Sequence, residues 1–104
     1  MEERRAEERS EVSWPVRVWL GEGVFAVARA VDASASGMRL TISPRAEAMI
    51  RVEQLYNLEV ESPRPLSCMA EVRHRTGGVG VAFKERRPEL ADLPAEADTR
   101  TPLA

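Results

Sequence analysis

The feature that most constrains the fold is a series of short runs in which apolar and polar residues alternate. In the first run, Val16, Val18 and Leu20 alternate with Arg17 and Trp19. A period of two is typical of a strand with one buried face. Similar runs cover residues 24–31, 38–42, 55–61, 66–75 and 79–83. Because turn-forming residues separate most of them, the sequence predicts six short strands in an all-β antiparallel barrel or sandwich. A barrel closes its own edges, which favours it for a small domain.

The two ends of the chain and one internal segment depart from this pattern. Residues 1–13 are polar, with five glutamates and three arginines, and are expected to form a flexible N-terminal arm. The barrel domain is expected over residues 14–93, with a short helical turn after Pro88, and residues 94–104 are expected to be a disordered tail. For residues 44–54 two structures remain open, a helix that begins at Pro44 or a long irregular crossover.

Composition excludes several classes of function. A net charge of −2 gives no broad basic surface, so long nucleic acid is not expected as a partner. The apolar runs are too short to span a bilayer and the N-terminus lacks the apolar segment of a secretory signal, so we expect a cytoplasmic protein with no membrane contact. With one cysteine (Cys68) and one histidine (His74), no disulfide within the chain and no zinc site can form. We expect no metal, no cofactor and no enzymatic activity, because no nucleophile and base converge.

Two polar motifs flank the first pair of predicted strands. The first is Arg5 and Arg9 in the spacing R-x-x-x-R, preceded by Arg4. A guanidinium group can bind the O6 and N7 atoms of guanine, clamp a phosphate, or stack on a purine. Alone, this spacing also fits a solvated terminus with salt bridges. With the second motif, it indicates ligand binding.

The second motif is Asp32, Ser34 and Gly37 in the spacing D-x-S-x-x-G. A carboxylate can accept hydrogen bonds from N1–H and N2–H of guanine, a donor pair that adenine lacks. The hydroxyl can donate to a phosphate or brace the turn, and glycine allows a positive φ and close approach of a ligand. Alone, these residue types also fit an ordinary turn. Together, the two motifs predict a pocket for an anionic ligand that contains guanine.

This arrangement resembles the PilZ domain, a bacterial receptor for cyclic di-GMP. The resemblance is in R-x-x-x-R, in D-x-S-x-x-G and in the strand–turn–strand sequence EVRHRTGGVGVAF, and it covers roughly residues 4–93. It implies a six-stranded antiparallel β-barrel with a short C-terminal helix. It also implies that the arm folds over a cyclic di-GMP molecule resting on the second motif. The implied contacts are Arg4, Arg5, Arg9, Asp32, Ser34 and Gly37, with Arg73 and Arg75 as additional candidates.

The resemblance further implies a mode of action. Arg4, at the position before the first motif arginine, favours an intercalated pair of ligand molecules over one. A downstream protein partner or a homodimer is expected to transmit the signal, with motility, pili or exopolysaccharide as outputs. Glu7 and Glu8 lie inside the arginine motif and compete for its guanidinium groups. The alternative function is therefore a PilZ-like protein–protein interaction module that binds no nucleotide.

Overall fold

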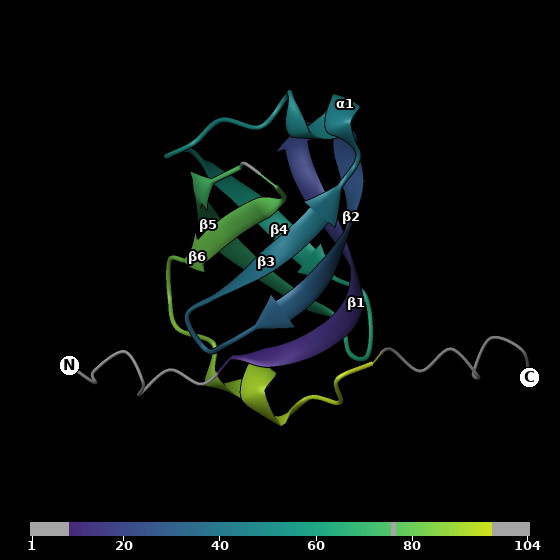
Figure 1. Cartoon of the computed structure of the whole chain (residues 1–104), viewed down its shortest axis with the longest axis vertical. Helices are drawn as coiled ribbons and strands as arrows, with labels where there is room; N and C mark the ends of the chain where they lie inside the picture. Colours follow the sequence, from purple (N-terminus) through teal and green to yellow (C-terminus); the bar gives the residue numbers. More distant parts are fainter. Residues whose placement is uncertain (1–8, 76, 97–104) are drawn as a thin grey trace, which may run out of the picture.

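The computed structural model describes residues 9–75 and 77–96, and its strands form a closed antiparallel barrel (Figure 1). Around the barrel the strands follow the order β1-β2-β3-β6-β5-β4. This confirms the prediction of a six-stranded barrel and decides between barrel and sandwich. The strands are β1 (Ser10–Gly21), β2 (Val24–Ala33), β3 (Gly37–Ile42), β4 (Leu55–Val60), β5 (Leu66–His74) and β6 (Val79–Phe83).

The alternating pattern of the sequence determines which side chains fill the barrel. In β5, Cys68, Ala70 and Val72 are buried, and Met69 on the opposite face is exposed. In β2, the inward side chains are alanines, and the larger Phe25 and Val27 point outward. Small side chains on one strand leave room for large ones from other strands, as close packing of an interior requires. The core therefore includes Trp14, Met38, Leu40, Ile50, Tyr56, Leu58 and Phe83.

Two interruptions of the strand register decide where two polar side chains point. Ala30 pairs with Leu40, but Asp32 pairs with Arg39, so β2 has one more residue than β3 over this stretch. In the same way, β5 has one more residue than β6 between the pair Val72–Val81 and the pair His74–Gly80. An extra residue of this kind, a β-bulge, re-aims the side chains that follow it. Strict alternation would turn Asp32 and His74 inward, and the bulges place them on the outer surface.

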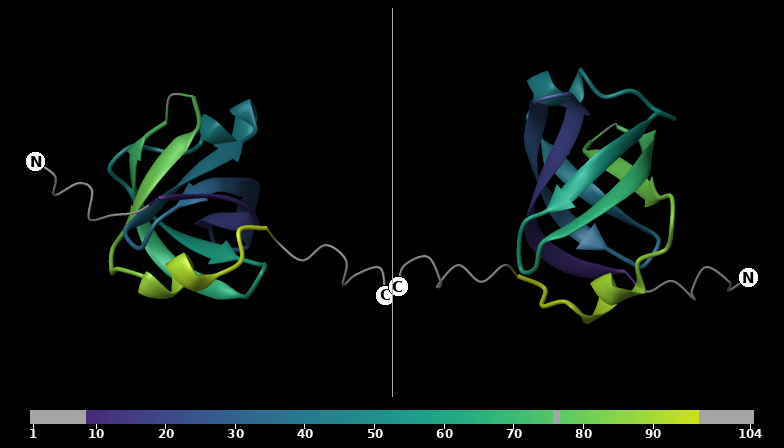
Figure 2. Two further views of the ribbon diagram at one scale, coloured as in Figure 1. Left: turned by 60° about the horizontal axis from the view of Figure 1, so that its bottom comes forward. Right: turned by 180° about the vertical axis from the view of Figure 1, so that it is seen from behind.

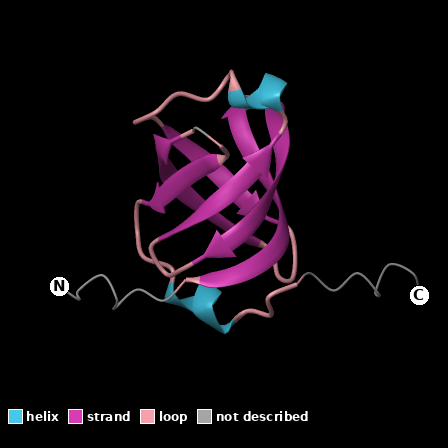
Figure 3. Cartoon of the chain, viewed as in Figure 1, coloured by secondary structure: helices cyan, strands magenta, loops and turns pink. Residues whose placement is uncertain are grey.

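Two short helical segments lie at opposite ends of the barrel (Figure 3). Helix α1 (Pro44–Glu47) begins at Pro44, and the Ser43 hydroxyl accepts a hydrogen bond from the Ala46 amide. An irregular segment continues to β4, so residues 44–54 combine both predicted structures. At the other end lies the 3-10 helix η2 (Pro88–Asp92) (Figure 2). Its Leu90 is buried and belongs to the core.

The ordered barrel extends beyond both predicted boundaries. Strand β1 begins at Ser10 rather than near Pro15, because Ser10 and Glu11 pair with the end of β2. After η2, the fully buried Trp14 donates an indole hydrogen bond of 2.9 Å to the carbonyl oxygen of Pro94. Ser13 donates its amide to the carbonyl oxygen of Ala95. Residues 10–13 and 94–96 thus belong to the folded domain, whereas residues 1–8 and 97–104 lie outside the described structure.

Candidate functional site

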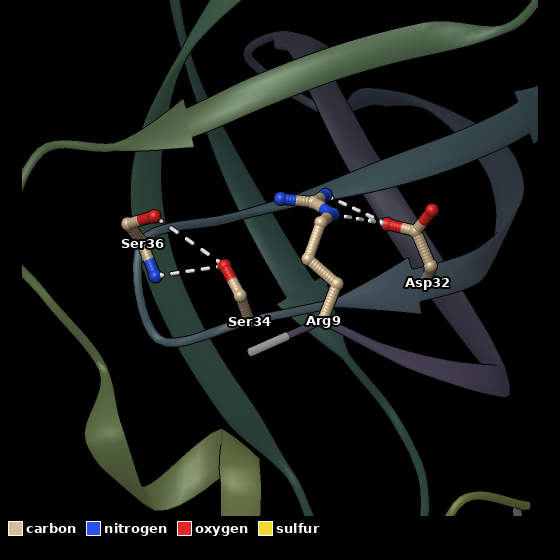
Figure 4. Close-up of polar contacts among 4 residues, drawn as sticks. All are labelled: Arg9, Asp32, Ser34 and Ser36. Atoms are coloured by element: carbon tan, nitrogen blue, oxygen red, sulfur yellow. Dashed lines mark hydrogen bonds and ion pairs between the residues drawn. The ribbon is translucent and has the colours of Figure 1, made fainter. Parts of the chain in front are cut away.

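The two sequence motifs meet at an ion pair between Arg9 and Asp32. Arg9 directly precedes β1, and Asp32 lies near the end of β2, 23 residues later. The Arg9 side chain extends toward Asp32 and donates two hydrogen bonds to its Oδ1, at 2.7 Å from Nη2 and 3.1 Å from Nε (Figure 4). Pairing of Glu11 with Asp32 holds the two segments side by side. Because about half of the Arg9 side chain is exposed, we expect this pair to add at most about 1 kcal/mol to stability.

A cavity of about 320 Å³ opens beside this ion pair. Strands β3, β5 and β6 supply the rest of its lining. Arg39 and Arg73 add two cations to the lining, and Asp32 is its only carboxylate among the described residues. Glu71 lies 3.7 Å from Arg73. The lining is therefore positive around the neutral Arg9–Asp32 pair. It consists of Arg9, Asp32, Met38, Arg39, Arg73, His74, Gly80 and Val81.

The strand register explains why these residues lie together. Asp32 pairs with Arg39, Arg39 with Gly80, and Gly80 with His74, which makes one row across four neighbouring strands. Cross-strand partners on one face have Cβ atoms only about 5 Å apart. Gly80 leaves a gap in this row, and the imidazole of His74 occupies it, since a Cβ on Gly80 would overlap this ring. The row places a carboxylate, a guanidinium and an imidazole along one side of the cavity.

Ser34 braces the turn between β2 and β3. It is 2% exposed, and its Oγ accepts a hydrogen bond of 3.2 Å from the Ser36 amide (Figure 4). Its own amide donates to the carbonyl oxygen of Gly37. Two further amides, from Phe83 and Arg87, donate to the carbonyl oxygens of Ser36 and Ala35. Of the two roles considered for this hydroxyl, bracing the turn is the one that these contacts support.

Gly37 is required by strand packing. Its backbone does not adopt the left-handed conformation that its position in the motif suggested, since the glycines with positive φ are Gly23, Gly77 and Gly78. A Cβ on Gly37 would instead overlap the carbonyl oxygen of Val81 in β6. Glycine at this position therefore lets β3 and β6 approach at the seam beside the cavity.

The other predicted contact residues differ in their placement. Arg4 and Arg5 lie outside the described residues. Arg73 lines the cavity, but Arg75 does not, because its guanidinium donates a hydrogen bond of 2.9 Å to the carbonyl oxygen of Glu47 beside α1. Sequence analysis missed Arg39 and His74. Arg39 could have been found from its outward position in β3, next to the second motif. His74 could not, because the bulge in β5 reverses the direction that alternation assigns to its side chain.

The described residues contain one cysteine thiol, and it is buried. Burial raises the pKa of the Cys68 thiol to about 11, so this thiol stays protonated at neutral pH and is a poor nucleophile. Across residues 9–75 and 77–96, no group of three or more His, Cys, Asp or Glu side chains could hold a metal ion. In the same part of the chain, no helix is long and apolar enough to cross a membrane.

The fold and the site together define a small β-barrel module with a surface cavity whose lining includes Arg9, directly before β1. A family model for the PilZ domain matches residues 3–93, and the chain therefore belongs to the PilZ family of cyclic di-GMP receptors. Among solved structures, it is similar to MotI/DgrA of Bacillus subtilis, described as an inhibitor of motility. The TM-score is 0.63 at 16% identity, and the match covers 81% of this chain and 44% of that one. No curated protein sequence matches significantly.

Proposed function

We propose that this protein binds cyclic di-GMP between its N-terminal segment and the cavity beside β3. The ligand contacts would come from Arg4, Arg5 and Arg9 of the first motif and from Asp32 of the second, while Ser34 and Gly37 of the second motif would shape the turn and the strand seam beside it. The observation that supports this most directly is the Arg9–Asp32 ion pair at the edge of a positively charged cavity. It joins two motifs that are distant in sequence, as a ligand site shared by both requires.

The geometry of the ion pair is compatible with recognition of guanine. Both hydrogen bonds from Arg9 go to Oδ1 of Asp32. A carboxylate offers about four acceptor positions over its two oxygens, so Asp32 keeps the capacity to accept from N1–H and N2–H of guanine. Arg9 is at the same time held where its remaining N–H groups can donate to the ligand. In this proposal, the ion pair positions both groups before the ligand arrives.

The cavity is small for a whole cyclic di-GMP molecule, so we propose that residues before Arg9 contact the rest of the ligand. Small-molecule pockets usually measure about 300–1,000 Å³, and this one lies at the lower end. A ligand with two guanine bases and two phosphates would therefore extend beyond the described cavity. Arg4 and Arg5 are the residues of the first motif that we propose to contact the outer part of the ligand. A second, intercalated ligand molecule would use the same arginines.

Signalling is proposed to follow from ordering of the arm. Residues 1–8 are joined to β1 through Arg9, which contacts Asp32, so a ligand that binds them would change the surface around the Asp32 turn. We propose that a bacterial protein partner in the cytoplasm, or a second copy of the chain, recognises this surface. Motility is the first output to examine, because the structural neighbour MotI/DgrA is described as an inhibitor of motility.

Isothermal titration calorimetry with cyclic di-GMP tests the proposed function. We expect binding by the unaltered protein and no binding of cyclic di-AMP. Arg5→Ala and Asp32→Ala should each weaken binding at least about 100-fold, since each removes charged hydrogen bonds. Arg45→Ala, which removes an exposed arginine of α1, is the matched control and should bind normally. Absence of heat with unaltered protein at high micromolar concentration would rule the proposal out.

A second candidate is an interaction module that binds no nucleotide. It is favoured by an exposed apolar surface of Val24, Phe25 and Val27 on β2, with Val27 70% exposed. Capture of one protein partner, compared with and without cyclic di-GMP, separates the candidates. Capture that is unchanged by nucleotide and by Arg9→Ala supports the second, and nucleotide-dependent capture supports the first.

A further inference from the structure

We infer that Arg39 binds a phosphate group of the ligand from the barrel side of the cavity. This inference rests on the proposed function and adds a residue that belongs to neither sequence motif. Arg39 lies in the middle of β3, between Asp32 on β2 and Gly80 on β6. Its backbone is held on both sides by strand pairing, so the guanidinium extends from a rigid element.

Among the described residues, no acid forms an ion pair with Arg39. Its guanidinium makes one hydrogen bond among the described residues, from Nη2 to the carbonyl oxygen of Gly77 at 3.3 Å. No carboxylate within residues 9–75 and 77–96 forms an ion pair with it. A guanidinium has five N–H donors, and this contact uses only one of them. A cation with unused donors in a cavity wall is suited to bind an anion.

The neighbours of Arg39 favour a phosphate over a base edge. Asp32, directly beside it in the row, is the acceptor that we assign to guanine. On its other side Gly80 has no side chain, and the His74 ring covers the gap. A phosphate next to the bound guanine would lie between Arg39 and Arg73, and of these two cations only Arg73 has an ion pair among the described residues, with Glu71 at 3.7 Å.

Two substitutions of Arg39 separate a role in charge from a role in shape. Arg39→Met keeps much of the aliphatic length and removes the charge, whereas Arg39→Lys keeps the charge and removes the planar fork. A lysine binds phosphate as a point charge but cannot form the bidentate contact with O6 and N7 of guanine. We expect Arg39→Met to weaken cyclic di-GMP binding at least about tenfold and Arg39→Lys to stay within about threefold of the unaltered protein.

The experiment is a calorimetric titration of the full chain with cyclic di-GMP at two salt concentrations, about 50 and 200 mM. Arg64→Met, which removes an exposed arginine from the loop between β4 and β5, is the matched control. Losing a phosphate contact should also reduce the dependence of affinity on salt in Arg39→Met but not in Arg64→Met. Thermal unfolding followed by circular dichroism checks that each variant is folded.

The outcomes for the two proposals differ. If the unaltered protein binds no cyclic di-GMP, the proposed function fails. If it binds and Arg39→Met binds equally well, the assignment of Arg39 fails and the proposed function stands. Equal losses in Arg39→Met and Arg39→Lys, with the salt dependence of affinity unchanged in both, would show a fork-dependent contact to a base edge, which overturns the assignment to phosphate.

Discussion

Two walls of the same barrel carry outward-pointing arginines in opposite environments. On the wall formed by β1 and β4, Arg17 lies 2.7 Å from Glu61 and 3.9 Å from Glu59, and its guanidinium lies over the ring of Phe25. On the wall formed by β3 and β6, Arg39 contacts only a carbonyl oxygen among the described residues. The difference teaches that the number of arginines on a surface does not identify a site. A candidate anion site is found where the surrounding groups leave the charge uncompensated.

The largest expected effect is a loss of stability in Gly37→Ala, because β3 and β6 lie very close together at Gly37. Gly37→Ala places a methyl group against the carbonyl oxygen of Val81, and neither backbone can move without disturbing the β3–β6 pairing. We expect a loss of about 2–3 kcal/mol in the free energy of unfolding, typical of overpacking. Chemical denaturation with urea measures it.

Gly21→Ala is the matched control for this prediction. Gly21 ends β1, and a Cβ there meets no atom within 4 Å. Its effect should lie within about 1 kcal/mol of zero, because alanine also reduces the freedom of the unfolded chain. Equal losses in the two variants would mean that the β3–β6 seam is not unusually close, and that the motif glycine serves another purpose.

The same comparison shows what could be predicted from the sequence. Alternation predicted each strand of the barrel, and the spacing of polar residues predicted both motifs, because these signals are local. The motif marked Asp32, but its place within β2 could not be predicted, nor could the outward direction of His74, since strict alternation along β2 and β5 would bury both side chains. The bulges that turn them outward depend on pairing with distant strands. Arg39 had no motif to mark it, and its importance depends on its forming no ion pair within residues 9–75 and 77–96, which only the assembled structure shows.

An intermediate effect is expected for Gly80→Ala, because the atoms that an added Cβ would overlap belong to a side chain rather than to the backbone. A Cβ on Gly80 would overlap the imidazole of His74, which is exposed and can rotate away. Gly80→Ala should therefore cost less than about 1 kcal/mol in stability, well below Gly37→Ala. Because the displaced ring would enter the cavity or leave its wall, we expect cyclic di-GMP affinity to fall about fivefold.

A double-mutant cycle tests whether this effect passes through His74. In a His74→Ala background, Gly80→Ala should have no further effect on affinity, since the ring it displaces is gone. If Gly80→Ala weakens binding equally in both backgrounds, the added methyl group obstructs the ligand directly, and the imidazole has no part in shaping the cavity.

The smallest expected effect is that of Arg17→Met. It decides whether ligand affinity depends on the net charge of the protein or on the local environment of each arginine. Arg17→Met removes the same charge as Arg39→Met, so a ligand attracted by the total charge of the protein would lose affinity equally in both. Arg17 is instead compensated by Glu59 and Glu61 on the wall opposite the cavity. At 0.15 M salt the Debye length of about 8 Å screens it from a ligand there. We expect less than about twofold change in calorimetric affinity and less than about 1 kcal/mol in stability, as for exposed ion pairs. A tenfold loss would show that net charge, rather than the local row of Asp32, Arg39 and His74, controls binding.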